Sequence, residues 1–235
     1  MKIDINGYIV PDELKVVYDW YGIAAFCPND IKQAKKKADS EHLEISIGTC
    51  YGGSIFAGSE IGAEIKNHTG GAEIEITGLA ASAASVITMF AKSKMAPTAM
   101  LMVHNVSSYA EGDWRTFAKE SDTLKECNKA MAAAYVMKTG MTEPEALKMM
   151  NDESWITAAK AKELGLIDEI MFENASQLVA TLGPGMLPKA AIDKALKIIS
   201  EKKAEQETAD KTAQENRDTV LTIARAKLNL IEKTI

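Results

Sequence analysis

The chain is poor in the residues that build disulfide frameworks and metal sites. It contains three cysteines, Cys27, Cys50 and Cys127, and three histidines among 235 residues. An odd number of cysteines without paired spacing indicates neither a disulfide scaffold nor a zinc site. We therefore expect reduced thiols, no metal ion and no cofactor. Cys50 stands beside a Gly-Gly pair, where a nucleophilic role is conceivable, but an inert thiol is the favoured interpretation.

Long apolar runs and a strong net charge are also missing. No apolar run reaches the ~20 residues that a membrane helix needs, and the opening MKIDINGYIV has a strand-like pattern without the features of a signal peptide. The net charge of −6 gives no basic surface for nucleic acid or for an anionic membrane. These absences predict a cytoplasmic globular protein that binds neither nucleic acid nor membrane.

The first part of the chain alternates between strand and helix patterns. Residues 43–47 alternate apolar and polar side chains as in a strand, and residues 54–66 form an amphipathic helical pattern. Residues 74–77 predict a short strand that Gly78 ends. Right-handed crossovers between such strands give an α/β fold with a mainly parallel sheet. In these sheets, sites form where the carboxyl ends of strands meet the N-termini of helices.

Three features fall at predicted strand carboxyl ends. They are the pair Gly52-Gly53, Ser82 in the small-residue run AASAAS, and His104 after the predicted strand 99–103. A serine at a helix start and a histidine at a strand end are two parts of a nucleophile–base pair. Ser85 lies one helical turn after Ser82 and is the rival nucleophile, and the residue pattern alone does not separate the two.

The second half of the chain predicts a long helix and then a change of composition. Residues 113–139 repeat apolar side chains at helical intervals, and this helix either packs on its own sheet or joins subunits. Composition changes after Asn174, with a Gly- and Pro-containing stretch and then a charged one. We therefore divide the chain into a domain at 1–174, a linker at 175–189, and a helical or partly disordered tail at 190–235.

Four segments, in this order, carry a family resemblance: YGGSIFAG, GLAASAASVI, AMLMVHN and DESWITAAKAKELGLIDEI. Through them, residues 1–174 resemble the ClpP-like serine proteases (peptidase S14). The stretches GYIVPDE, VYDWYGI and GPGMLP are similar to the bacteriophage head maturation (prohead) protease branch of that family. The resemblance implies a ClpP/crotonase-like fold of repeated β-β-α units, with a mainly parallel sheet and a long projecting helix.

The resemblance also assigns catalytic roles to particular residues. It implies that Ser82 is the nucleophile and His104 the general base. The third member is normally an aspartate two residues before an aromatic residue. In this chain the aromatic is Trp155 and the matching position is Glu153, a longer carboxylate, with Asp152 as the alternative. A glutamate can orient an imidazole as an aspartate does.

The same resemblance places the oxyanion hole at the backbone N–H groups of Gly53 and Ala83. Cys50-Tyr51 departs from the Ser-Pro that often precedes the glycine pair, and this change is expected to affect the turn or the substrate-binding strand. A serine–lysine dyad through Lys92 or Lys94 is a disfavoured alternative, because His104 already fills the position of the base.

The implied activity is that of a serine endopeptidase, a hydrolase that uses no ATP of its own and proceeds through an acyl-enzyme. The phage resemblance implies processing of capsid or scaffold proteins during prohead maturation in the host cytoplasm. The ClpP resemblance further implies a homo-oligomer with heptameric rings, while stacking of rings and an unfoldase partner stay open. The alternatives are a catalytically inactive assembly or scaffold protein with the same fold and, more remotely, a crotonase-type acyl-CoA enzyme.

Overall fold

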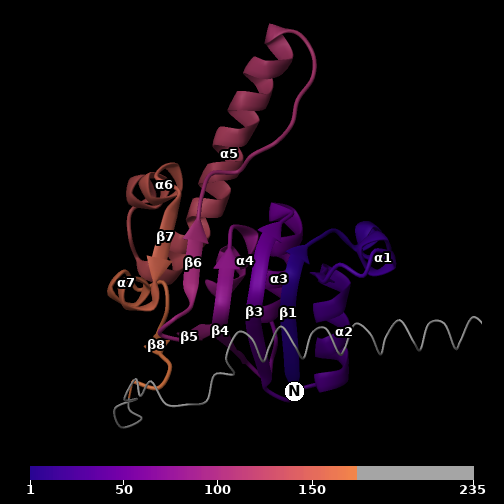
Figure 1. Cartoon of the computed structure of the whole chain (residues 1–235), viewed down its shortest axis with the longest axis vertical. Helices are drawn as coiled ribbons and strands as arrows, with labels where there is room; N and C mark the ends of the chain where they lie inside the picture. The colour runs from indigo at the N-terminus through magenta and orange to yellow at the C-terminus, as the bar shows by residue number, and fades with distance from the viewer. Residues whose placement is uncertain (174–235) are drawn as a thin grey trace, which may run out of the picture. The chain divides into compact units, whose positions relative to one another are not determined.

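The computed structural model describes residues 1–173 (Figure 1). The predicted linker at 175–189 and tail at 190–235 lie outside the described residues. The strands within the described part are β1 (Lys2–Ile9), β2 (Ala25–Phe26), β3 (Leu43–Gly53), β4 (Ala72–Ala81), β5 (Lys92–Met95), β6 (Met100–Val103), β7 (Ser154–Thr157) and β8 (Glu169–Ile170). The helices are α1 (Asp12–Trp20), α2 (Pro28–Ala38), α3 (Ile55–Lys66), α4 (Ala83–Thr88), α5 (Trp114–Thr139), α6 (Glu143–Asn151) and α7 (Ala158–Glu163).

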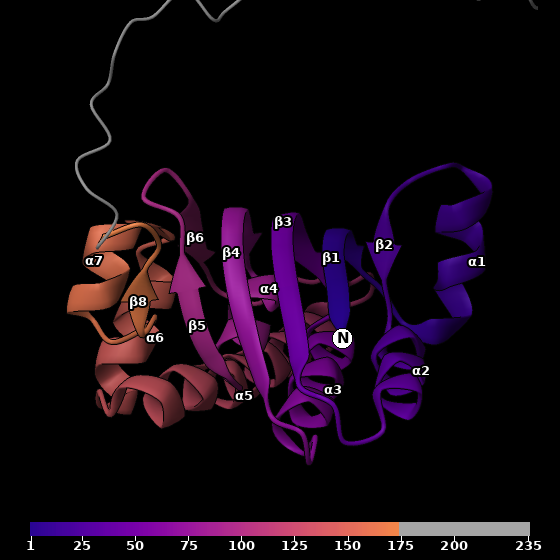
Figure 2. The same ribbon diagram turned by 90° about the horizontal axis from the view of Figure 1, so that it is seen from below.

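The strands form one mainly parallel sheet. Its order is β2-β1-β3-β4-β5-β8, all parallel, while β6 pairs in parallel with β4 and in antiparallel with β7. The helices α2, α3 and α5 lie on the same side of this sheet (Figure 2). Isoleucines on alternate positions of β1, β3 and β4 are buried against that side, and the polar residues between them face the other. The predicted α/β fold class is confirmed.

The end of β4 corrects the sequence interpretation. Gly78 does not end this strand, which continues to Ala81. Between the pairs Ile47–Ile76 and Thr49–Leu79, β4 advances by one residue more than β3, which is a bulge. A Cβ on Gly78 would lie 2.3 Å from the carbonyl oxygen of Gly48. This glycine therefore permits a close approach of two strands, and β4 carries the chain directly to the next residue, Ser82.

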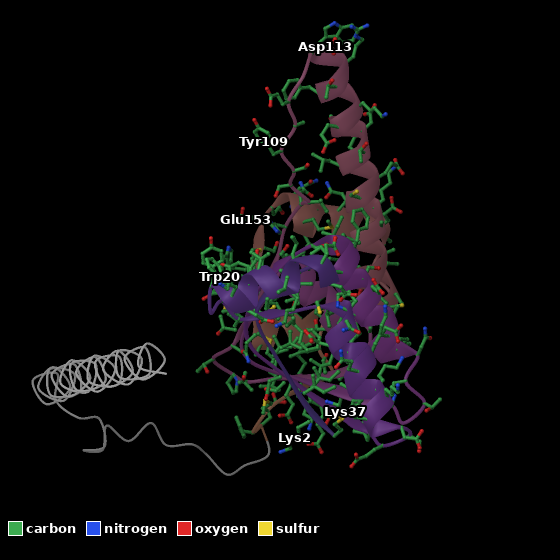
Figure 3. The ribbon with its side chains drawn as sticks, turned by 90° about the vertical axis from the view of Figure 1, so that its right-hand side faces the viewer. Lys2, Trp20, Lys37, Tyr109, Asp113 and Glu153 are labelled. Carbon is green, nitrogen blue, oxygen red and sulfur yellow. The ribbon has the colours of Figure 1, made fainter. Side chains whose placement is uncertain are left out.

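The predicted long helix is present as α5, which begins after Asp113 and ends at Gly140. The Asp113 carboxylate accepts hydrogen bonds from the first backbone N–H groups of α5, and Gly140 adopts a left-handed conformation with φ 77°. The buried side chains of α5 lie only in its second half, at 131–135. Its first half projects beyond the sheet, with Asp113 at the far end and Tyr109 partway along the projection (Figure 3). The helix thus packs on its own sheet through one half and leaves the other uncovered.

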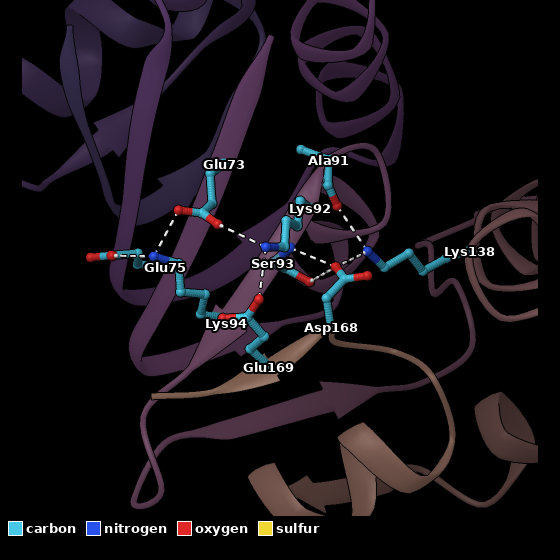
Figure 4. Close-up of polar contacts among 9 residues, drawn as sticks. All are labelled: Glu73, Glu75, Ala91, Lys92, Ser93, Lys94, Lys138, Asp168 and Glu169. Atoms are coloured by element: carbon cyan, nitrogen blue, oxygen red, sulfur yellow. Dashed lines mark hydrogen bonds and ion pairs between the residues drawn. The ribbon is translucent and has the colours of Figure 1, made fainter. Parts of the chain in front are cut away.

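Asp168 anchors the C-terminal end of α5 to the edge of the sheet. Its Oδ2 accepts a hydrogen bond from the Ser93 backbone N–H at 2.7 Å and pairs with Lys138 of α5, which also donates to the Ala91 carbonyl (Figure 4). Burial alone would raise the pKa of Asp168. The hydrogen bonds from Lys138 and Ser93 outweigh that effect and hold the pKa below its ordinary value.

This arrangement predicts an acid-sensitive contribution to stability. Replacing Asp168 with asparagine is expected to lower the free energy of unfolding at pH 7 by about 1–2 kcal/mol. The folded pKa lies below the unfolded value of ~3.9, so the stabilisation is present above that pH and is lost as the pH falls through the folded pKa. Urea unfolding should show a smaller difference in the free energy of unfolding between Asp168→Asn and wild type in acid than at pH 7. The control is Glu169→Gln, which removes an exposed carboxylate beside Lys92 and should change little. An equal difference at both pH values would contradict the prediction.

Candidate active site

Ser82 occupies a strained turn between β4 and α4. Its backbone has φ 55° and ψ −124°, a conformation that residues with a Cβ rarely adopt and that costs on the order of 1–3 kcal/mol. The Ser82 N–H donates to the carbonyl of Met102 at 2.8 Å, and the Ser82 carbonyl accepts the N–H groups of Ser85 and Val86 in the first turn of α4. Hydrogen bonds on both sides of the turn therefore hold the strained residue in place. Sharp strand-to-helix turns of this kind present nucleophilic serines.

His104 follows directly after β6 and contacts this serine. Its Nε2 lies 2.8 Å from the Ser82 Oγ. The contact follows from topology, because β4 and β6 are parallel neighbours with Ala81 opposite Met102, so both strands end at the same edge of the sheet. A hydroxyl hydrogen-bonded to an imidazole is the arrangement that activates serine as a nucleophile.

The rival serine has a different environment. Ser85 is fully buried, and its Oγ donates to the Ser82 carbonyl at 2.7 Å and lies 2.8 Å from the Tyr135 hydroxyl. Burial raises the pKa of Tyr135 to about 12, so this phenol stays neutral and donates to Ser85. Ser85 therefore fastens α4 to α5 and the strained turn, with no hydrogen bond to His104.

The two candidate carboxylates differ in position. Val103 of β6 pairs with Ser154 of β7 in an antiparallel ladder, and His104 and Glu153 are the next residues outward. The Glu153 side chain is exposed, and its carboxylate makes no hydrogen bond within the described part of the chain. Asp152 instead pairs with Lys148 in the preceding turn. The ladder ends at Val103 and Ser154, one residue short of His104 and Glu153, and Glu153 has φ 47°, outside the strand conformation. No hydrogen bond or ion pair joins Glu153 or Asp152 to His104 within the described residues.

The end of β3 and the start of α4 bring backbone close to Ser82. The N–H of Ala83 is in the first turn of α4, where no helical carbonyl can accept it, and Gly53 lines the same cavity. A Cβ on Gly52, which has φ 83°, would lie 2.6 Å from the Ala81 carbonyl oxygen and 2.9 Å from the Ala83 nitrogen. The end of β3 can therefore approach the start of α4 only because Gly52 has no side chain. The oxyanion hole predicted from the N–H groups of Gly53 and Ala83 requires this close approach and stays a prediction.

A cavity of about 230 Å³ opens beside the serine and histidine. Its apolar walls come from segments far apart in the sequence: Ile55, Val86, Val106, Met131 and Tyr135. A pocket of this composition fits one apolar side chain of a polypeptide. Sequence reasoning did not identify these wall residues, because helical periodicity marks such positions only as core.

The remaining candidate nucleophiles and bases lie elsewhere. Cys50 is buried, and burial raises the pKa of its thiol, which opposes thiolate formation. Lys94 of β5 lies opposite Glu75 of β4 and pairs with Glu73 and Glu75. Glu75 is seven residues before Ser82 along β4, which is roughly 20 Å of strand. Lys92 lies opposite Glu73, farther still from Ser82, and pairs with Glu169. The serine–lysine alternative therefore has no geometric support.

Within residues 1–173, no group of three or more metal-ligating side chains occurs. None of the helices in that range combines the length and hydrophobicity that a membrane crossing requires.

Comparisons with known proteins identify the family of this chain. A sequence profile described as Clp protease matches residues 29–174. The chain is 29% identical over 126 residues to the ATP-dependent Clp protease proteolytic subunit 1 of Chlamydia abortus, covering 52% of this chain and 66% of that protein. It is 32% identical over 130 residues to the ATP-dependent Clp protease proteolytic subunit of Mesostigma viride, covering 54% and 56%.

These relatives place the chain in a family but not in a branch of it. The matches span slightly less than two thirds of the length of the Chlamydia abortus protein and little more than half of the Mesostigma viride protein. Both are named as proteolytic subunits of Clp protease, so the predicted affinity with bacteriophage maturation proteases stays a prediction. The family profile itself covers more than half of the chain, including Ser82, His104 and Glu153. The chain belongs to the Clp protease family.

Proposed function

We propose that this protein is a serine endopeptidase of the ClpP type. The observation that carries the proposal is the 2.8 Å contact between the Ser82 Oγ and the His104 Nε2, at a strained turn that leads into α4. In the proposed reaction, His104 takes the proton of Ser82 as its oxygen attacks a peptide carbonyl. The N–H groups of Gly53 and Ala83 accept the negative charge that develops on the carbonyl oxygen.

The second half of the reaction uses the same groups. His104 returns its proton to the leaving amine, which leaves an acyl-enzyme on Ser82, and then activates a water that hydrolyses the ester. Histidine suits both steps because its side chain changes charge near neutral pH. The apolar cavity holds the side chain next to the bond that is cut and so positions the carbonyl between nucleophile and donors.

Glu153 completes the proposed triad when its exposed side chain turns onto His104. A carboxylate there would fix the imidazole tautomer and stabilise the imidazolium. Glu153→Gln is therefore expected to lower kcat for peptide hydrolysis by about 10²–10⁴-fold, whereas Asp152→Asn, which loses only the pair with Lys148, should leave kcat near the wild-type value. Steady-state kinetics on a fluorogenic peptide measures both. A large loss in Asp152→Asn with none in Glu153→Gln would make Asp152 the third member of the triad. If neither variant lost activity, Ser82 and His104 would act without either carboxylate.

The proposed substrates rest on the resemblance to phage maturation proteases, and the proposed assembly rests on the resemblance to ClpP. The proposed substrates are capsid or scaffold proteins, and the proposed active form is a heptameric ring of identical subunits. The uncovered half of α5 supports self-association, because Tyr109, Trp114 and Phe117 expose large aromatic surfaces on it and on the loop before it.

One observation favours the second candidate, an assembly protein without catalysis. The Glu153 carboxylate is exposed and makes no hydrogen bond to the imidazole or to any other residue in the described range, so the third member of the triad is disengaged in this conformation. Catalytic hydrogen bonds are often long in resting enzymes, and only a measurement of cleavage separates the two candidates.

The experiment compares the wild-type protein with Ser82→Ala on two substrates, unfolded casein and a phage scaffold protein. New internal N-termini that depend on Ser82, identified by mass spectrometry, would establish endopeptidase activity. Cleavage of casein but not of the scaffold protein would support the peptidase activity and contradict the proposed role in capsid maturation. If neither substrate is cut in a Ser82-dependent manner, the assembly protein becomes the better account.

A further inference from the structure

Aromatic side chains stand on the open face of the sheet, next to the cavity. On β1 and β3, alternate residues point away from the helices, and near the carboxyl ends these residues are Tyr8 and Tyr51. Tyr8 pairs with Gly52 in the β1–β3 register, so the two tyrosines are neighbours across the strands. Tyr51 also lines the cavity that contains Ser82. The aromatic surface is therefore continuous with the proposed catalytic site.

The rings form a short row that leads away from the cavity. The Tyr8 ring centroid lies 5.4 Å from that of Tyr51 and 5.9 Å from that of Tyr18 on α1, with tilted planes. Such separations are typical of favourable aromatic pairs. Tyr8 and Tyr51 nevertheless remain 40% and 52% exposed. We call Tyr51, Tyr8 and Tyr18 the tyrosine row.

The third ring comes from a segment that the family match does not include. The matched region begins at residue 29, whereas α1 ends at Trp20. No residue of α1 is buried, so core packing does not explain the apolar and aromatic residues of this helix. An exposed helix that contributes a ring to the row is consistent with a role in binding.

We propose that the tyrosine row is a second side-chain subsite, which takes an aromatic or large apolar side chain of the polypeptide substrate. The proposal rests on the proposed peptidase function and specifies its substrate. A polypeptide bound in extended form next to Ser82 places successive side chains about 3.3 Å apart along its length. When one side chain fills the cavity, a flanking residue on the side of Tyr51 passes over the row. Because Tyr8 and Tyr51 are partly exposed and the row consists of tyrosine rings alone, an aromatic side chain at that flanking position would pack on them favourably.

The test uses fluorogenic peptides with methionine fixed at the residue that enters the cavity and with phenylalanine or alanine at each flanking position. At one flanking position, phenylalanine should raise kcat/KM over alanine by about 2- to 10-fold, the range expected for an aromatic pair. Tyr8→Ala should reduce that ratio to about 1, while Tyr8→Phe, which keeps the ring, should retain it. The matched control is Trp20→Ala, which removes a 78% exposed aromatic from α1 outside the row and should also retain the ratio.

A binding measurement keeps the subsite separate from catalysis. Fluorescence anisotropy gives the Kd of a labelled phenylalanine-containing peptide for Ser82→Ala, for Ser82→Ala with Tyr8→Ala, and for Ser82→Ala with Trp20→Ala. Weaker binding only when Tyr8 is removed supports the subsite even if the wild-type protein cuts no peptide, in which case the peptidase function alone fails. Two results would contradict the subsite without contradicting the peptidase function. One is cleavage with no preference for phenylalanine over alanine at any flanking position. The other is a preference and a peptide Kd that are unchanged by Tyr8→Ala. Thermal unfolding of each variant verifies that it folds.

Discussion

Replacing Ser82 with alanine is expected to lower kcat for peptide hydrolysis by about 10⁴–10⁶-fold, the range for removal of a catalytic serine. The reason is geometric, since Ser82 is the serine whose hydroxyl contacts the imidazole of His104. The β4–α4 turn should survive the change, because its hydrogen bonds to Met102, Ser85 and Val86 use the backbone of residue 82. Steady-state kinetics at saturating peptide, with thermal unfolding as the test of folding, measures the effect.

Ser85→Ala is the matched control three residues away. Ser85 bonds to the Ser82 carbonyl and to the buried Tyr135 hydroxyl, and its loss leaves that hydroxyl without its partner. The expected result is a loss of about 1–3 kcal/mol in stability with most of the activity retained at a temperature where the variant is folded. If Ser85→Ala instead abolished hydrolysis in a folded protein and Ser82→Ala did not, the assignment of the nucleophile would be reversed.

Gly52→Ala is expected to abolish the proposed peptidase activity, although the mechanism gives residue 52 no contact with the substrate. The added Cβ would lie 2.7 Å from the Cβ of Ser82 and 2.9 Å from the nitrogen of Ala83, so β3 and the start of α4 must separate. Separation moves the Ala83 N–H away from the developing oxyanion, and losing one such donor typically costs about 10²–10³-fold in kcat. We expect at least that loss, together with lower stability.

The control for this variant separates steric conflict from backbone strain. Gly22 also has a positive φ, 67°, but a Cβ there would meet nothing within 4 Å. Gly22→Ala should therefore cost about 1–2 kcal/mol of stability through strain alone and leave kcat unchanged. Wild-type kcat in Gly52→Ala would show that the close approach of β3 to α4 is not needed for the reaction.

The sequence was informative where topology alone fixes a position. Ser82 and His104 each follow a parallel strand, and neighbouring parallel strands end at one edge, so their meeting could be expected. Gly78 was misread because a glycine suits both a strand end and a close approach of strands, and only the carbonyl of Gly48 distinguishes these cases. The strand β5 was not predicted, because its Lys92 and Lys94 are polar and its buried Ser93 is held by Asp168, 75 residues later in the chain.

The candidate site was predictable only in its polar members. The cavity walls come from α3, α4, α5 and a loop, and no local pattern distinguishes a wall residue such as Met131 from any other buried residue. The tyrosine row likewise depends on the register between β1 and β3, which places Tyr8 beside Tyr51. Such arrangements arise from pairing over long sequence separations, and sequence periodicity does not encode that pairing.

Labelling with a fluorophosphonate probe, followed by peptide mapping, tests whether His104 activates the Ser82 hydroxyl, because the probe reacts with an activated serine and not with an ordinary hydroxyl. We expect a covalent adduct on Ser82 in the wild-type protein, in Ser85→Ala and in Cys50→Ala. We expect no adduct in Ser82→Ala and a greatly reduced one in His104→Ala. Equal labelling of wild type and Ser82→Ala, or an adduct on Ser85, would contradict the activation of Ser82.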